Sequence, residues 1–268
     1  MVETVPVDHG LPGHGWTLNK LQQWVAQRLQ RAVSRGQLRA LLKRSGLSWK
    51  KCKKVLKKAN PAKRAAFVKE VAALFQQMCE DEVLLIYIDE AHIHRDMDLG
   101  YTWARVGQAA YRLSDCASLA ERINWYGAYD FAQGRCLIWN EGNCNTEHTI
   151  TFLERVVAWI GPTDKRIVLI WDGASYHRST LVRDAATELT LDIVPLPAYS
   201  PDLNPIEGLW KWLREEVTQH HSYPNLRALF DACIAFIARI NRDPLRIISR
   251  LWPKFDLDPN YEKLLVST

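Results

Sequence analysis

The 268-residue chain contains no run that approaches the roughly 18 uninterrupted apolar residues of a membrane-spanning helix. Its N-terminal stretch, MVETVPVDHGLPGHG, has neither a basic start nor an apolar segment, so it does not read as a secretion signal. Because 47% of the residues are hydrophobic and 24% are charged, the chain can bury a substantial core. We therefore expect a globular, cytoplasmic protein.

Cysteine occurs without any functional pattern. The six cysteines are scattered along the chain, with no Cys-x-x-Cys pair and no histidines at the spacing of a zinc site. This distribution argues against a zinc-binding module and favours reduced thiols that are buried or incidental.

Negative charge is missing over a long stretch. Between His9 and Lys69 there are 16 Lys and Arg residues and no Asp or Glu. Residues 1–69 carry a net charge of +14, which leaves −9 for residues 70–268. A solvated basic face on an ordinary helical domain usually mixes both signs. The division instead favours a basic part that contacts phosphates joined to an acidic part that holds divalent cations, as expected of a nucleic-acid enzyme.

The basic part has the apolar spacing of three helices. Apolar residues recur every three or four positions over residues 17–33, Ser34 and Gly46 bound a shorter second helix, and a third runs from Ser48 to residue 60. Such an arrangement is typical of a helix-turn-helix whose last helix enters the major groove, although small three-helix bundles also bind proteins. The DNA-binding candidates are the cations of the last two helices, Arg39, Arg44, Lys50, Lys51, Lys53, Lys54, Lys57 and Lys58.

A further amphipathic helix, capped by Asn60 and Pro61, carries the chain from the basic part to the acidic part. We therefore expect a helix-turn-helix domain over residues 1–60, a connector helix over 61–82 and a second domain over 83–268.

Beyond the connector the pattern changes to strands. Continuous apolar runs end at Asp89 and at Asp172, as in central buried strands. Further strands are predicted at residues 100–107, 123–131, 135–143 and 191–197, and helices at 145–161, 178–189 and within 223–253. Strands first, then alternating helices and strands, predict a mixed α/β sheet flanked by helices. Ligands of such sheets bind at the carboxyl ends of strands, where both aspartates fall.

A third carboxylate, Glu207, follows the proline-rich stretch LPAYSPDLNPIE. The local interpretation is helix capping, with Asn204 as the N-cap, Pro205 at the first helical position and Glu207 at the third. Asp89 can likewise simply end a strand, and Asp172 can form a turn. Taken together, two acids that terminate long apolar strands and one on a proline-stiffened arm favour a cluster over three separate structural roles.

The chemistry of such a cluster would be metal chemistry. Carboxylates about 4 Å apart repel by about 4 kcal/mol per pair at an effective dielectric of 20, so cations are expected between them. Oxygen ligands without Cys or His favour Mg²⁺, with Mn²⁺ as a substitute. Two such ions can activate a water or a 3′-hydroxyl at a phosphodiester and stabilise the leaving oxygen. We expect two ions in the active site.

Three blocks of the sequence, YIDEAH, WDGASYH and LPAYSPDLNPIEGLWKWL, resemble the signature blocks of DDE transposases of the mariner superfamily, especially its bacterial insertion sequence 630 branch. The 34 residues between Asp172 and Glu207 match the interval typical of that superfamily. YTWARVGQ also looks like a segment of these proteins, and the resemblance extends over about residues 20–260.

The resemblance implies a ribonuclease-H-like catalytic domain in which Asp89, Asp172 and Glu207 are metal ligands, with Asp89 bridging two ions. It also implies cleavage of both strands at terminal inverted repeats and joining of the 3′ ends to target DNA at a TA dinucleotide. His177 and Asn204 are the expected supporting residues. The expected partners are double-stranded DNA, at element ends and target, and a second copy of the chain on DNA; the DNA-bound protein would be associated with the nucleoid.

The sequence departs from the family pattern at two places. Gly173 stands where relatives often have Asn, which alters the surroundings of Asp172 without removing a ligand. Relatives usually carry two helix-turn-helix modules, whereas only one is found here, so we expect the first module to be encoded upstream of Met1. Two alternatives stay open: a catalytically inactive, domesticated DNA-binding remnant, and a different ribonuclease-H-like nuclease or integrase.

Overall fold

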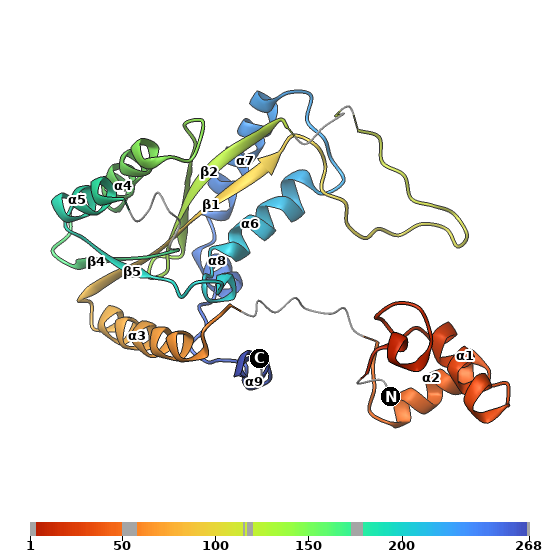
Figure 1. The fold of residues 1–268 in the computed structure, drawn as a ribbon. Coiled ribbons are helices and arrows are strands. Elements are labelled where there is room, and N and C mark those ends of the chain that lie inside the picture. The colour runs from red at the N-terminus through yellow and green to blue at the C-terminus, as the bar shows by residue number, and fades with distance from the viewer. Residues whose placement is uncertain (1–3, 50–57, 115, 117–119, 173–178, 267–268) are drawn as a thin grey trace. The chain divides into compact units, whose positions relative to one another are not determined.

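The computed structural model describes residues 4–49, 58–114, 116, 120–172 and 179–266. The chain forms two compact units, Met1–Lys54 and Val55–Thr268 (Figure 1). Each unit has hydrophobic clusters of its own.

The first unit is helical. Its small core consists of Leu21, Val25 and Leu38, and Ser34 forms a capping box with Gln37 that starts the second helix. The elements are a 3₁₀ turn at Pro6–His9, α1 (Leu18–Leu29) and α2 (Arg35–Arg44). The first two predicted helices are therefore confirmed, α1 ending four residues short of the predicted end. Most of the predicted third helix lies outside the described residues.

The second unit is built on one five-stranded sheet with the order β3-β2-β1-β4-β5. β1 pairs antiparallel with β2 and parallel with β4, while β2–β3 is antiparallel and β4–β5 parallel. The strands are β1 (Val83–His94), β2 (Arg122–Asp130), β3 (Arg135–Trp139), β4 (Arg166–Trp171) and β5 (Leu191–Pro195). The predicted mixed sheet is confirmed, and β1 continues five residues beyond Asp89.

Helices cover both faces of the sheet (Figure 1). One hydrophobic cluster lies under α4 and α5, and the other joins the opposite face to α3, α6, α7 and α8. Successive residues of β1 alternate between the two clusters, as side chains of a strand must. The helices are α3 (Pro61–Cys79), α4 (Thr146–Ile160), α5 (Thr180–Glu188), α6 (Glu207–Leu213), α7 (Leu226–Ile240), α8 (Pro244–Arg250) and α9 (Pro259–Val266).

Helix α3 is part of the second unit. Its apolar residues Phe67, Val71 and Leu74 are buried in the same cluster as β1. The segment predicted as a connector is thus packed on the sheet, because its apolar stripe needs a hydrophobic partner. The structure divides the chain at residues 54 and 55, six residues before the predicted end of the first domain.

The segment between β1 and β2 corrects one prediction. Residues 100–107, predicted as a strand, pair with no strand in the part of the chain that the structure describes. Their aromatic and aliphatic side chains have no sheet to pack on, and Tyr101 and Trp103 are 98% and 101% exposed. The base of this arm is fixed where the Asp98 amide donates to the Thr218 carbonyl at 3.0 Å and the His220 amide donates to the Asp98 carbonyl at 2.9 Å.

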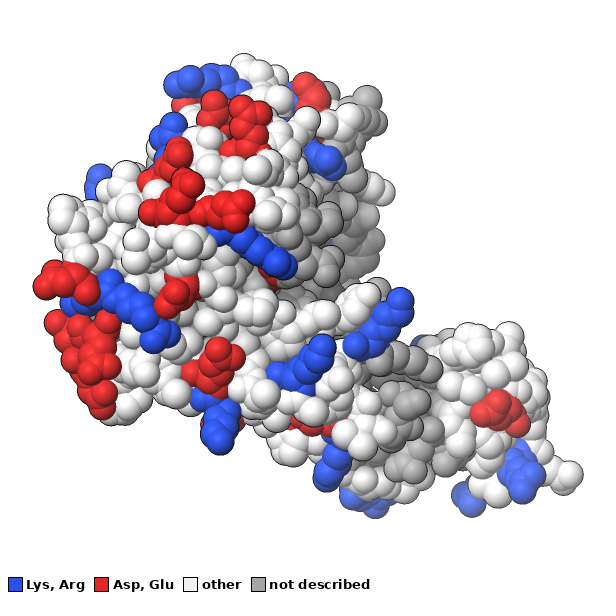
Figure 2. All heavy atoms as spheres, turned by 60° about the vertical axis from the view of Figure 1, so that its left-hand side comes forward, with Lys and Arg blue, Asp and Glu red and all other residues white. Residues whose placement is uncertain are grey.

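Charge is distributed unevenly over the second unit. Figure 2 shows the side that carries α4 and α5, where acidic side chains gather in several groups with basic side chains between them.

Among the described helices none is long and apolar enough to cross a membrane. The cysteines that the structure describes, Cys79, Cys116, Cys136, Cys144 and Cys233, are free thiols, in agreement with the sequence.

Candidate active site

The register of the sheet brings Asp89 and Asp172 together. Tyr87 on β1 pairs with Ile170 on the parallel strand β4, and both side chains lie in the cluster that faces α6. Each aspartate follows its partner by two residues, so side-chain alternation directs Asp89 and Asp172 to that same face at neighbouring positions. The two acids thus occupy neighbouring positions on one face of the sheet, Asp89 within β1 and Asp172 directly after β4.

Glu207 reaches the site differently from the capping prediction. Helix α6 begins at Glu207 itself, two residues later than predicted, after a turn in which the Glu207 amide donates to the Asn204 carbonyl at 3.2 Å. The Asn204 side chain does not cap the helix. It is 4% exposed, and its Nδ2 donates to the carbonyl of Ile88 at 3.2 Å. Asn204 therefore ties the proline-rich loop to the residue that precedes Asp89.

The buried side chain of Arg64 also anchors the proline-rich loop. The Arg64 side chain on α3 is completely buried, and its Nη1 and Nη2 donate to the two carboxylate oxygens of Asp202 at 2.9 and 3.1 Å. Its Nε donates to Glu262 at 2.9 Å, and Lys254 lies 2.8 Å from Asp202. This contact escaped the sequence analysis because Arg64 is one cation among many in the basic stretch; only the position of Asp202 within the proline-rich block pointed to it.

A tryptophan contacts Asp89 directly. The indole Nε1 of Trp210, on α6, donates to Asp89 Oδ2 at 3.0 Å. The sequence shows Trp210 only as one apolar residue of an amphipathic helix, so nothing in the local pattern marks it. On the same segment, Arg214 donates to the carbonyl of His92 at 3.1 Å. The segment that carries Glu207 is therefore attached to β1 at several points.

Burial and neighbouring carboxylates raise the pKa of both Asp89 and Glu207. Burial raises the pKa of Asp89 well above its ordinary value, and the charges of Glu207, Glu90 and Asp172 add to this effect. A hydrogen bond from the Glu90 backbone acts in the opposite direction. Glu207 lies at the exposed rim, yet desolvation by surrounding protein raises its pKa; the Arg214 guanidinium lowers it and Asp172 raises it. Three carboxylates thus share one electrostatic environment.

The donor set suits a hard divalent cation, since all three side chains offer oxygen. In the described part of the chain, however, no group of three or more His, Cys, Asp or Glu side chains is arranged closely enough to hold a metal ion. The three acids share a face and repel one another without surrounding a common position. A cation would relieve this repulsion, so the residues fit Mg²⁺ or Mn²⁺ in chemistry. His177 lies outside the described residues.

We expect Asp89→Asn to stabilise the metal-free protein. A carboxyl whose pKa is raised by folding favours the folded state below its unfolded pKa of about 3.9 and loses that advantage as pH rises toward the raised value. The cost therefore grows as pH rises toward the raised pKa, and the amide removes it. Calorimetry in chelator near pH 8 should give a Tm higher by at least about 2 °C than wild type, since 1 kcal/mol shifts Tm by roughly 2–4 °C at this size.

The difference between Asp89→Asn and wild type should shrink as pH is lowered toward the unfolded pKa of about 3.9, because protonation removes the charge whose burial is costly. A variant that is less stable than wild type at both the higher and the lower pH would contradict this electrostatic account.

The predicted DNA-binding cations are only partly described. Arg39 and Arg44 are exposed on α2. Lys58 belongs to the second unit, where its Nζ lies 6.0 Å from the ring centre of Tyr199. The remaining candidates, Lys50, Lys51, Lys53, Lys54 and Lys57, lie outside the described residues.

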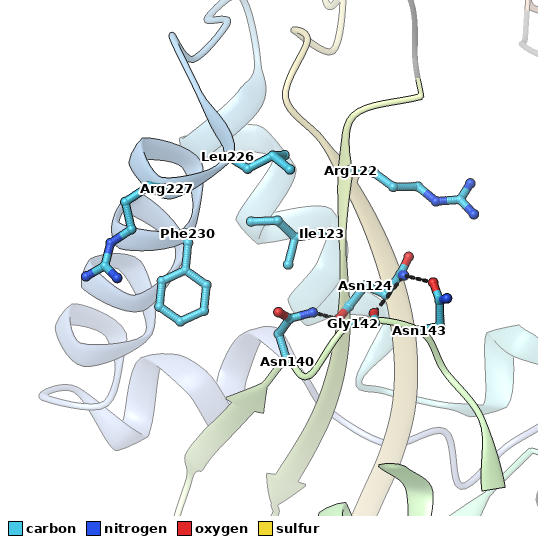
Figure 3. Close-up of a pocket in the computed structure, with 9 residues that line it drawn as sticks. All are labelled: Arg122, Ile123, Asn124, Asn140, Gly142, Asn143, Leu226, Arg227 and Phe230. Atoms are coloured by element: carbon cyan, nitrogen blue, oxygen red, sulfur yellow. Dashed lines mark hydrogen bonds between the residues drawn. The ribbon is translucent and has the colours of Figure 1, made fainter. Parts of the chain in front are cut away.

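A cavity of about 440 Å³ lies beside the start of β2 and the start of α7 (Figure 3). Two hydrogen bonds join residues of its lining: the Asn124 side chain donates to the carbonyl of Gly142 at 2.9 Å and the Asn140 side chain donates to the carbonyl of Asn124 at 2.6 Å. The lining residues are Arg122, Ile123, Asn124, Asn140, Gly142, Asn143, Leu226, Arg227 and Phe230, and include none of the predicted site residues. The cavity is separate from the carboxylates.

Comparisons with known proteins agree with this geometry. Residues 84–230 match the family model described as DDE superfamily endonuclease, and residues 12–71 match one described as winged helix-turn helix. Among curated proteins, the chain is similar to the insertion element IS630 uncharacterized 39 kDa protein of Shigella sonnei. The two are 23% identical over 247 residues, which cover 91% of this chain and 70% of that protein.

Solved structures show the same fold. The chain is similar to the Mos1 strand transfer complex, with a TM-score of 0.65 and 17% identity over 97% of this chain and 80% of that chain. It is also similar to the mariner Mos1 paired end complex with Mg, with a TM-score of 0.65 and 18% identity over the same shares of the two chains. The predicted fold class, a ribonuclease-H-like mixed sheet preceded by a helix-turn-helix region, is confirmed.

Proposed function

Because the chain belongs to the DDE superfamily of endonucleases, we propose that it is a DNA transposase of the insertion sequence 630 and mariner group. The observation that carries the proposal is the meeting of Asp89 and Asp172 on one face of the sheet, within electrostatic reach of Glu207. The similarity to an IS630 protein over 91% of the chain supports it further.

The roles of the three acids follow from this proposal. Asp89, Asp172 and Glu207 would hold Mg²⁺, or Mn²⁺ in its place, with two ions in each active site. Bound ions would activate a water or a 3′-hydroxyl and stabilise the leaving oxygen at a phosphodiester. The Mos1 paired end complex has been solved with Mg and with Mn, which supports this choice of metals. Asn204 and the Arg64–Asp202 pair would keep Glu207 at the site.

The proposed substrate is double-stranded DNA at two places. The enzyme would cut at the terminal inverted repeats of its element and join the freed 3′ ends to target DNA at TA dinucleotides. The 34-residue interval between Asp172 and Glu207 and the proline-rich block support a mariner-like reaction over that of another ribonuclease-H-like nuclease.

DNA binding is assigned to the basic stretch of residues 1–69, and catalysis to the carboxylates of the second unit. The net charge of +14 over residues 1–69 and the helix-turn-helix match support this division. We expect Lys53→Glu with Lys57→Glu to weaken DNA binding without unfolding the protein. If about six cations contact phosphates, wild-type affinity should fall roughly a thousandfold between about 50 and 200 mM salt. Fluorescence anisotropy measures both effects; a flat salt response, or unchanged affinity of the double variant, would move the contact elsewhere.

We also propose that the protein acts as a homodimer on DNA. The arm between β1 and β2 carries large apolar side chains that solvent surrounds almost entirely: Leu99, Tyr101, Trp103, Val106, Tyr111 and Leu113 are at least 81% exposed. Monomeric proteins rarely leave so much contiguous apolar surface uncovered. A second copy on the DNA would supply a surface for this arm.

The function is tested by incubating supercoiled plasmid with the purified protein in Mg²⁺, Mn²⁺, Ca²⁺ or chelator. Nicked and joined products should form with Mg²⁺ or Mn²⁺ and be absent with chelator, and sequenced junctions should lie at TA. A protein that binds DNA but cuts under none of these conditions would favour the inactive, domesticated remnant. Cleavage without joining would favour a nuclease of the same fold.

A further inference from the structure

We propose that Trp210 is a positioning residue for Asp89 and that Gly127 is the residue that makes its position possible. The inference rests on the proposed function, because it concerns how Asp89 is presented to a divalent cation. Trp210 would then have a role in the active site in addition to its packing in the core.

The contact joins two buried groups. Trp210 is 1% exposed and Asp89 is 9% exposed, and the indole Nε1 lies 3.0 Å from Asp89 Oδ2. The terminal torsion of an aspartate is soft, so burial alone leaves its carboxylate free to turn. A charge-assisted hydrogen bond from a rigid, packed indole holds one named oxygen in place. The orientation of the carboxylate is therefore set before any cation binds.

Trp210 also links the first acid to the third. It follows Glu207 by three residues on α6, about one helical turn, so the two side chains lie on neighbouring positions of one helix surface. Nearby, the Asn204 side chain bonds to the carbonyl of Ile88. Two consecutive residues of β1, Ile88 and Asp89, are thus each bonded to the segment that carries Glu207. The indole fixes the distance between Asp89 and Glu207 as well as the orientation of Asp89.

Gly127 provides the space for the indole. It pairs directly with Asp89 across the β1–β2 ladder. A Cβ at this position would lie 2.5 Å from Cη2 of Trp210, closer than atoms of a packed core approach one another, and 3.3 Å from the end of Ile206, which is a tight contact. Any other residue would push the ring away from Asp89. The glycine is needed for close approach and not for backbone conformation.

The chain offers a matched control in Trp212. It lies two residues further along α6, is completely buried, and also donates its Nε1 to a carboxylate, Glu216 Oε1, at 2.5 Å. Glu216 is not one of the three acids of the site, and its carboxylate pairs with Arg239. Replacing Trp212 removes the same chemical groups from the same helix without touching Asp89.

The test is metal binding by the full chain, without DNA and without turnover. Mn²⁺ is titrated into wild type, Trp210→Phe, Trp212→Phe and Gly127→Ala, and free Mn²⁺ is measured by electron paramagnetic resonance. The binding that Asp89→Asn removes defines the site. We expect Trp210→Phe and Gly127→Ala to weaken this binding roughly 10- to 100-fold, as for other groups that orient metal ligands. Trp212→Phe should match wild type in binding despite a similar loss of stability, followed by urea unfolding.

Each outcome is decisive. Wild-type affinity in Trp210→Phe would overturn the proposal, as would an equal loss in Trp212→Phe, which would mark a general effect of destabilisation. If Trp210→Phe does not fold, Gly127→Ala decides, because it keeps the indole and only displaces it. Absence of Asp89-dependent Mn²⁺ binding in the wild type would instead count against the proposed function.

Discussion

Asp172→Asn and Glu207→Gln should each reduce the rate of plasmid nicking by at least about a thousandfold, while affinity for DNA stays near the wild-type value. Each change replaces a charged oxygen ligand by an amide of the same shape, so packing is preserved while the negative charge that attracts a divalent cation is lost. When several residues act together in one catalytic step, removing any one of them abolishes nearly all of the enzyme's activity. The measurement is single-turnover nicking in Mg²⁺ and in Mn²⁺.

The control for this experiment is Asp184→Asn. Asp184 is exposed on α5, against the opposite face of the sheet, so its replacement removes one acid from the same unit without touching the site. It should nick at the wild-type rate. Substantial nicking by Asp172→Asn or by Glu207→Gln would show that the replaced residue is not a metal ligand.

Arg64→Met should lower the free energy of unfolding by about 3 kcal/mol, within the range found when one partner of a buried ion pair is removed. The substitution leaves Glu262 without its partner, and Asp202 with only Lys254. It also removes the guanidinium that stacks 4.7 Å from the ring of Tyr261. Part of the Asp202 side chain reaches solvent, which moderates the cost. Urea unfolding of the full chain measures the difference.

Arg227→Met provides the comparison for Arg64→Met. Arg227 pairs with Asp231 on the surface of α7, one turn away, and both side chains are more than half exposed. Such a pair contributes about 0.5 kcal/mol or less. We also expect the Arg64 variant to nick plasmid more slowly at temperatures where it remains folded, because the loop before Glu207 loses its anchor. Equal stability of the two variants would mean that the buried pair offers no more than a surface pair.

Local sequence patterns predicted most of the helices and strands that the structure shows. The apolar runs before Asp89 and Asp172 predicted buried strands, because a strand covered on both faces must be apolar throughout. Apolar residues spaced three and four positions apart in residues 17–33 predicted a helix, because this spacing places them on one face that can be buried. One prediction was wrong: YTWARVGQ has the composition of a strand, but it pairs with no strand among the residues that the structure describes.

The sequence by itself determined which acids carry the proposed chemistry and which segments become helices and strands. Each of these features depends on a pattern of a few neighbouring residues. Only the tertiary structure decided their partners. Trp210 and Asp89 are 121 residues apart, and Arg64 and Asp202 are 138. Those contacts depend on β1 lying between β2 and β4 and on the face that each side chain occupies. Periodicity describes one element at a time, so it cannot specify which side chain of a distant element will meet a given carboxylate.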